Sequence, residues 1–291
     1  MILIDIAGST RCDRWLVWPR LTMNPQSPSP SGVSHNQLPG YYCSLAPFRE
    51  LFESGNPVLT YHKLGPRPGK VRLKGLYASA GLFRRQLTEL KAAGFTSGSL
   101  KDCAGPSQSR RIVLTFDDGY VNVLRHAVAP LAATGFKAIQ FLPANLLGRC
   151  NEWDVTLGET PEAIMDVAQV REWLAAGQLI GSHTLDHPYL TQIPGAAARE
   201  QVVASKKKLE DLFGMVIEHF CYPYGDWNLA VSDLVAEAGY RTACTTEVGV
   251  NFPTDSPFAL KRFTVRYPTR NLKTLRESLQ NAWRRWLTLR N

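Results

Sequence analysis

The chain alternates short β-branched and aromatic runs with longer segments in which apolar residues recur at helical spacing. The apolar runs cover residues 57–61, 111–116, 137–142, 179–181, 218–221, 241–245 and 260–265. Helical spacing marks residues 83–90, 121–134, 167–176, 195–213, 229–238 and 272–289, and glycine follows several of these segments. Alternating strands and helices are typical of βα units with a parallel sheet. We therefore expect an α/β fold, a distorted or incomplete (β/α) barrel of about seven mostly parallel strands.

The chain is long enough for one large domain. Residues 24–40 are rich in Pro, Ser, Asn and Gly, so residues 1–55 are expected to form a flexible N-terminal segment. Residues 56–268 are expected to form the folded domain. The last segment, 269–291, is predicted to be a helix packed on that domain.

Composition excludes several classes of protein. Hydrophobic residues make up 44% of the chain and charged residues 20%, as in globular proteins. The formal net charge of +8 is spread along the sequence, so no nucleic-acid partner is expected. Six widely spaced cysteines include no C-x-x-C pair, which indicates reduced thiols rather than a cysteine zinc site. No apolar run has the length of a membrane span, no secretory signal is evident, and a cytoplasmic location is expected.

Two adjacent carboxylates, Asp117 and Asp118, directly follow a predicted buried strand in the run T-F-D-D-G-Y. Neighbouring carboxylates repel each other unless a cation or a proton neutralises one of them. Because successive residues at a strand end point in different directions, one carboxylate can bind a metal while the other transfers protons. A solvated Asp-Gly turn is the alternative for this motif taken alone.

Two histidines four residues apart, His183 and His187, follow another predicted strand. This spacing lets both imidazoles face one centre, either on a helical turn or across a tight loop. Together with a carboxylate they make a three-ligand site with open positions, which is typical of catalytic zinc. Cobalt, nickel and iron accept the same ligands.

A third motif, F-C-Y-P-Y-G at residues 220–225, combines Pro and Gly in a turn after a strand. Such a turn can direct the backbone amide of Tyr224 into a pocket, where it can stabilise an oxyanion. A packing turn with a buried aromatic residue is an equally good interpretation of this motif alone.

In this order, the three motifs resemble those of the polysaccharide deacetylases of carbohydrate esterase family 4, which share the NodB homology domain. The resemblance covers about residues 57–265. It implies that Asp117 is the catalytic base and that Asp118, His183 and His187 bind the metal. It also implies that the Tyr224 N–H stabilises the oxyanion and that the substrate is an acetylated glycan.

The sequence departs from the family pattern in two places. Cys221 stands where the third motif usually has the arginine that orients the base, and the late motif with an acid histidine is missing. His62 instead follows the first predicted strand, which resembles the circularly permuted branch that includes the poly-N-acetylglucosamine deacetylases. There the resemblance implies that His62 is the general acid. We further hypothesise that Arg262 supplies the positive charge missing at Cys221; a surface ion pair is the alternative.

Three aromatic residues, Tyr120, Trp153 and Trp227, lie beside the motifs and are candidates for binding a sugar ring, with packing as the alternative. The expected reaction is removal of an N-acetyl group from an N-acetylglucosamine-type sugar or polysaccharide. Hydrolysis of an O-acetyl ester or of a cyclic amide would use the same residues. A carbohydrate-binding module without activity is the alternative from a different class.

Overall fold

The computed structural model describes residues 41–107, 110–155 and 158–266. Seven strands form one parallel sheet in the order β10-β1-β5-β6-β7-β8-β9, and β4 pairs with the start of β5. The strands are β1 (Val58–Tyr61), β4 (Thr96–Ser97), β5 (Arg111–Phe116), β6 (Ala138–Leu142), β7 (Leu179–Ser182), β8 (His219–Cys221), β9 (Thr242–Cys244) and β10 (Phe263–Thr264). A separate two-stranded parallel pair joins β2 (Lys63–Leu64) to β3 (Tyr77–Ala78).

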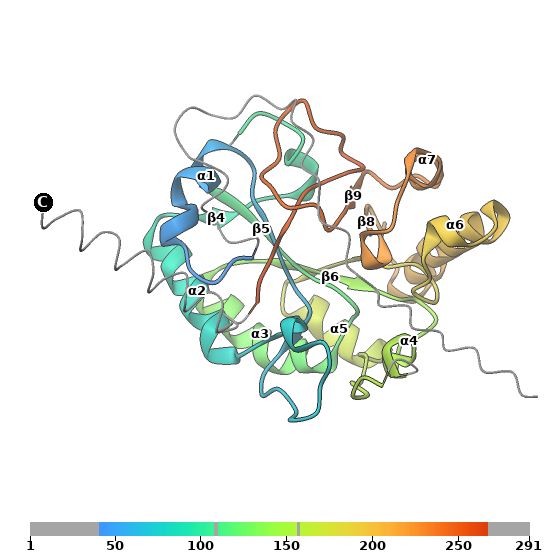
Figure 1. The fold of residues 1–291 in the computed structure, drawn as a ribbon, viewed down its shortest axis with the longest axis horizontal. Coiled ribbons are helices and arrows are strands. Elements are labelled where there is room, and N and C mark those ends of the chain that lie inside the picture. Colours follow the sequence, from blue (N-terminus) through green and yellow to red (C-terminus); the bar gives the residue numbers. More distant parts are fainter. Residues whose placement is uncertain (1–40, 108–109, 156–157, 267–291) are drawn as a thin grey trace, which may run out of the picture. The chain divides into compact units, whose positions relative to one another are not determined.

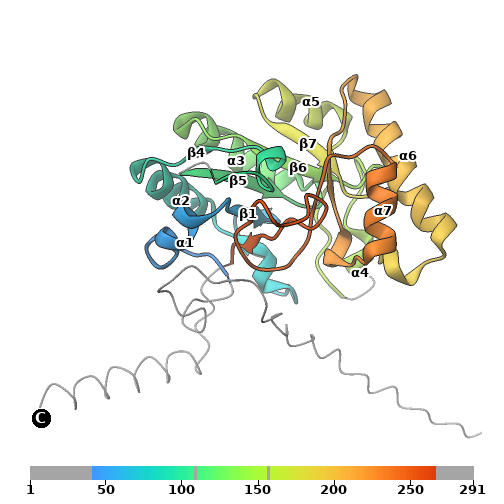
Figure 2. The same cartoon turned by 90° about the horizontal axis from the view of Figure 1, so that it is seen from above.

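Helices lie along the outside of the sheet (Figure 1). They are α1 (Arg49–Ser54), α2 (Ala80–Ala92), α3 (Val121–Thr134), α4 (Glu152–Val155), α5 (Val167–Ala175), α6 (Gly195–Phe213) and α7 (Leu229–Glu237). In the view from above, α6 and α7 lie side by side at the end of the sheet away from α1 (Figure 2). None of the described helices is long and apolar enough to cross a bilayer.

The expected incomplete (β/α) barrel is therefore confirmed. All seven predicted strands and the five predicted helices between residues 80 and 237 are present, with bounds that differ by a few residues at most. The main strands are buried on both faces, as expected for a parallel sheet covered by helices. An isolated parallel bridge between Cys244 and Leu260 brings the chain leaving β9 close to the chain entering β10. The predicted helix at 272–289 lies outside the described residues.

The expected flexible segment needs a correction, because residues 41–55 belong to the folded core. Tyr42, Phe48 and Phe52 are fully buried, and their rings pack against one another at centroid distances of 5.4–5.6 Å. Phe48 and Phe52 also contact the ring of Phe263 in β10. The Pro- and Ser-rich composition that predicted flexibility ends at residue 40, before this aromatic cluster begins.

These contacts predict that the N-terminal aromatic cluster stabilises the whole domain. We expect Phe52→Ala to lower the free energy of unfolding by about 3–5 kcal/mol, because it leaves a cavity beside Tyr42, Phe48 and Phe263. The matched control is Arg49→Ala on the same helix, which removes only an exposed ion pair with Glu53 and costs less than about 1 kcal/mol. Urea unfolding measures both values. Equal, small losses in the two variants would show that this segment does not belong to the cooperative unit.

Candidate metal and catalytic centre

Parallel strands bring the predicted site residues to one edge of the sheet. His62 follows β1, Asp117 and Asp118 follow β5, and His183 follows β7. His62 lies at the carboxyl end of β1, whereas Arg262 directly precedes β10, the other neighbour of β1, and extends its side chain to Asp117. The edge formed by the carboxyl ends of the strands is where barrel folds carry their chemistry.

Asp118, His183 and His187 form a buried cluster of potential metal ligands. One carboxylate oxygen of Asp118 lies 3.3 Å from Nε2 of His183 and 3.3 Å from Nε2 of His187. The three ligand atoms lie within 4.8 Å of one another, and all three residues are at most 5% exposed. Burial raises the pKa of Asp118, but the hydrogen bonds with both imidazoles outweigh it and hold that pKa well below its usual range.

The hydrogen bonds around this cluster fit a cation. Nδ1 of His183 lies 2.7 Å from the carbonyl oxygen of Cys221, which can only accept, so Nδ1 carries the proton. Burial lowers the pKa of His183, but its contacts with Cys221 and Asp118 outweigh burial and raise that pKa well above its usual value, so Nε2 can also carry a proton and donate to Asp118. A bound divalent metal would take the place of this Nε2 proton, and the hydrogen bond from Nδ1 would fix the tautomer of the ligating ring. The residues present therefore fit a zinc-type site.

A tight loop, not a helical turn, brings the two histidines together. Thr184 and His187 have positive φ angles of 69° and 63°, and Asp118 has one of 71°. Such angles are strained in residues other than glycine and persist where the surroundings enforce them. Here the Thr184 hydroxyl accepts from the His187 N–H, and the side chain of Gln201 in α6 accepts from the Leu185 and Asp186 N–H groups.

Asp117 is held by a buried arginine from the far end of the chain. Arg262 donates from Nη1 to Oδ1 of Asp117 and from Nη2 to Oδ2, both at 2.8 Å. Arg262 is 1% exposed and Asp117 is 3% exposed. Burial raises the pKa of Asp117, but the guanidinium together with His62 lowers it below its usual value. The carboxylate therefore stays ionised, and this pair is no surface ion pair.

Cys221 cannot supply the missing charge itself. Its Sγ lies 3.2 Å from Nη2 of Arg262 and 3.7 Å from Oδ2 of Asp117. Burial raises the pKa of this thiol to about 11, so it stays neutral. The hypothesis that Arg262 brings a positive charge to Asp117 agrees with this contact, whereas its part in turnover stays a prediction.

The remaining predicted site residues lie close by. Nε2 of His62 is 3.7 Å from Oδ2 of Asp117, and burial lowers the pKa of this histidine while Asp117 and Asp118 oppose that shift. Tyr224 adopts φ 60° and ψ 2° in the turn Pro223–Gly225, and its N–H has no acceptor among the described groups. The Tyr224 ring meets His187 edge-on, with centroids 4.5 Å apart.

The three candidate aromatic residues lie in different environments. Trp153 stacks on His187, with ring centroids 4.2 Å apart and planes 18° from parallel. Trp227 is half-buried and stacks on Tyr222 at 6.0 Å. Tyr120 is fully buried, so the expectation that it binds a sugar ring is corrected. Gly119, at φ 75°, turns the chain at this point, and the Tyr120 ring faces the ammonium group of Lys63 at 4.8 Å.

Sequence reasoning missed Lys63, Asp154 and Tyr189. Lys63 is fully buried between the rings of Tyr77 and Tyr120, and its ammonium group has no hydrogen-bond partner among the described residues. Burial raises the pKa of Asp154, which interacts with both Asp118 and Lys63. Tyr189 stacks on Tyr224. The position of Tyr189, two residues after His187, is the one signal in the sequence that points to this edge of the sheet.

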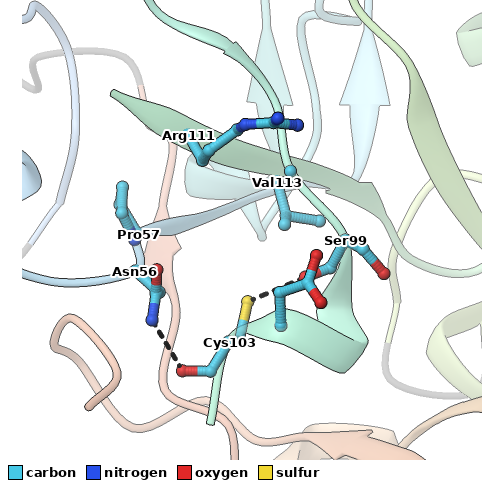
Figure 3. Close-up of a pocket in the computed structure, with 8 residues that line it drawn as sticks. Asn56, Pro57, Ser99, Cys103, Arg111 and Val113 are labelled. Carbon is cyan, nitrogen blue, oxygen red and sulfur yellow. Dashed lines mark hydrogen bonds between the residues drawn. The ribbon is translucent and has the colours of Figure 1, made fainter. Parts of the chain in front are cut away.

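A shallow hollow at the opposite edge carries no comparable chemistry (Figure 3). It is lined near the amino ends of β1 and β5 by residues that include Asn56, Ser99, Cys103 and Arg111. Asn56 donates to the carbonyl oxygen of Cys103, and the Cys103 thiol contacts the Ser99 carbonyl. Burial raises the pKa of Cys103 to about 12, so the thiol is unreactive there.

The fold and the site together define a (β/α)-barrel protein with a metal-type Asp-His-His centre. Residues 104–243 match the family model described as polysaccharide deacetylase. Over this stretch, just under half of its length, the chain is similar to the polysaccharide deacetylase family of enzymes.

Individual proteins that are similar to this chain include named deacetylases. A Bacillus subtilis protein, YxkH, named as a candidate polysaccharide deacetylase, is 27% identical over 53% of this chain and 51% of its own length. The chitooligosaccharide deacetylase of Azorhizobium caulinodans is 36% identical over 22% of this chain and 31% of its own length. The chain thus matches about half or less of these relatives. The solved structure of IcaB from Ammonifex degensii is 25% identical, has a TM-score of 0.64, and covers 74% of this chain and 93% of that one.

The buried pair of Asp117 and Arg262 generates a prediction about stability. Arg262→Met leaves the Asp117 carboxylate buried without its cation, and we expect it to lower the free energy of unfolding by about 3–5 kcal/mol. Adding Asp117→Asn removes the buried charge, so the double variant should regain most of that loss. Urea unfolding of the wild type, both single variants and the double variant completes the cycle. Strictly additive losses would contradict a direct coupling of the two side chains.

Proposed function

We propose that this protein is a metal-dependent deacetylase that hydrolyses the N-acetyl group of an N-acetylated sugar or polysaccharide of the N-acetylglucosamine type. The observation that carries the proposal is that the two neighbouring carboxylates contact different groups. Asp118 faces two histidines, and Asp117 faces a buried arginine and His62. The match to the polysaccharide deacetylase family and the likeness to IcaB support an acetylated glycan as substrate and the poly-N-acetylglucosamine branch.

Asp118, His183 and His187 would hold the metal. A donor set of one carboxylate and two imidazoles suits zinc, and cobalt, nickel and iron are the alternatives. When bound, such an ion polarises the acetyl carbonyl and lowers the pKa of water.

The chain's own residues would complete the reaction. Asp117 accepts the proton of the attacking water, and Arg262 fixes the orientation of its carboxylate. The free N–H of Tyr224 donates to the oxyanion that forms on the acetyl carbonyl. His62 protonates the amine as the carbon–nitrogen bond breaks, which releases acetate and a free amino sugar.

Other substrates would use the same groups. An O-acetyl ester or a cyclic amide also passes through a tetrahedral oxyanion, so Tyr224 and Asp117 would keep their roles. A non-catalytic carbohydrate-binding module would not need an ionised Asp117 held by a buried arginine, and this pair favours an enzyme. A cytoplasmic location and the absence of a nucleic-acid partner stay predictions from the sequence.

The first experiment is acetate release from N-acetylglucosamine oligomers. We expect activity to disappear with a chelator and to return with zinc, because Asp118, His183 and His187 form one ligand set. His187→Ala should bind far less zinc than the wild type when both are assayed by elemental analysis, a readout that needs no turnover. Val216→Ala, at an exposed position before β8, serves as the control and should bind zinc normally. Chelator-resistant activity, or none on any acetylated substrate, would refute the proposal.

A second experiment tests Arg262 as a positioning residue. Arg262→Ala should lower kcat by about 10²–10⁴-fold, the range contributed by general acid–base catalysis, with zinc content unchanged. The double variant Cys221→Arg/Arg262→Ala returns a guanidinium to the position that carries it in most of the family. It should therefore recover part of the lost kcat. Unchanged turnover in a folded Arg262→Ala variant would exclude this role.

A further inference from the structure

Two exposed tyrosines form a stacked pair beside the proposed metal centre. The rings of Tyr189 and Tyr224 are 3.8 Å apart at their centroids and 5° from parallel. Tyr189 is 42% exposed and Tyr224 is 37% exposed, so both rings are accessible from solvent. Neither phenol hydroxyl has a hydrogen-bond partner among the described residues.

Hydrogen bonds between the two loops hold this pair in place. Tyr189 precedes the short helix Leu190–Gln192, and Tyr224 lies in the turn Pro223–Gly225. Asp226 accepts from the Thr191 N–H at 2.8 Å and from the Thr191 hydroxyl at 2.7 Å and 3.0 Å. The Asp226 carboxylate is therefore engaged within the chain, and the tyrosine pair is ordered before any ligand arrives.

The pair adjoins the centre and is open to solvent. The Tyr224 ring meets His187 edge-on, and Tyr189, the more exposed of the two tyrosines, stacks on Tyr224. A glycan with one acetyl group at Asp117 and Asp118 would have its neighbouring sugar units close to this exposed pair. Flat apolar ring faces flanked by free hydroxyls match the apolar faces and the hydroxyl groups of a pyranose ring.

We propose that Tyr189 and Tyr224 form a binding subsite for the sugar unit next to the one that loses its acetyl group. This inference rests on the proposed function and adds to it the residues that would select oligomers over the monosaccharide. The protein would bind oligomers of N-acetylated sugars in preference to the monosaccharide.

Glycan binding in an Asp117→Asn background tests the subsite without turnover. Calorimetry measures the Kd for N-acetylglucosamine and for its β-1,4- and β-1,6-linked pentamers. Tyr189→Ala should weaken binding of the preferred pentamer about three- to tenfold, the range of one aromatic stacking contact, and should change the monosaccharide Kd far less. Tyr189→Phe keeps the ring and should retain most of the pentamer affinity. Val216→Ala, exposed at the other edge of the sheet, is the control.

Each result decides the inference separately from the proposed function. An equal loss for monosaccharide and pentamer, no loss in Tyr189→Ala, or a wild type that binds both ligands equally would overturn the subsite. Acetate release by the wild-type enzyme is measured independently. Its absence would refute the deacetylase proposal, whereas the pentamer Kd would still report on Tyr189.

Discussion

The buried ion pair between Asp117 and Arg262 connects the candidate catalytic centre to the closure of the barrel. Burying two charges is costly unless each finds several partners. Arg262 meets this condition, since its guanidinium also donates to groups contributed by other strands: the hydroxyls of Thr60 and Thr115, the carbonyl oxygen of Thr245 and the thiol of Cys221. One side chain thereby contacts β1, β5 and β8 and the segment after β9. Arg262 directly precedes β10, the last described strand. Its bond to Thr245 therefore connects β10 to the segment after β9, and β9 and β10 are the two ends of the incomplete barrel.

This arrangement explains how two adjacent aspartates remain buried together. Asp117 faces the guanidinium, while Asp118, in a left-handed conformation at φ 71°, turns toward His183 and His187. Each carboxylate thus has its own source of positive charge. The ion pair of Asp117 requires no metal, whereas the contacts between Asp118 and the two imidazoles fit one. The site consequently combines a carboxylate held within the chain with a second one available as a ligand.

Much of the fold was predictable because it depends on local patterns. Short β-branched runs and helical periodicity identify the seven strands and the main helices, and their order implies a parallel sheet. The Asp118, His183 and His187 cluster followed from motifs at strand ends. The contact of Arg262 with Asp117 spans 145 residues, so no local pattern reveals it; only the gap at Cys221 suggested a replacement. Tyr120 was wrongly expected to bind a sugar ring, because the turn at Gly119 directs its ring inward. Tyr189 was missed because its stacking partner, Tyr224, lies in a different loop.

The absence of the usual arginine at position 221 therefore does not indicate a lost function. Electrostatic orientation of a carboxylate depends on where the charge lies, not on which strand carries it. Arg262 contacts both oxygens of Asp117 and also touches the Cys221 sulfur, so it occupies the space that a longer side chain at position 221 would need. The small neutral side chain of Cys221 thus leaves room for the guanidinium of Arg262, and together the two residues place one positive charge beside Asp117. Restoring arginine at position 221 alone would place two guanidinium groups in a site that accommodates one.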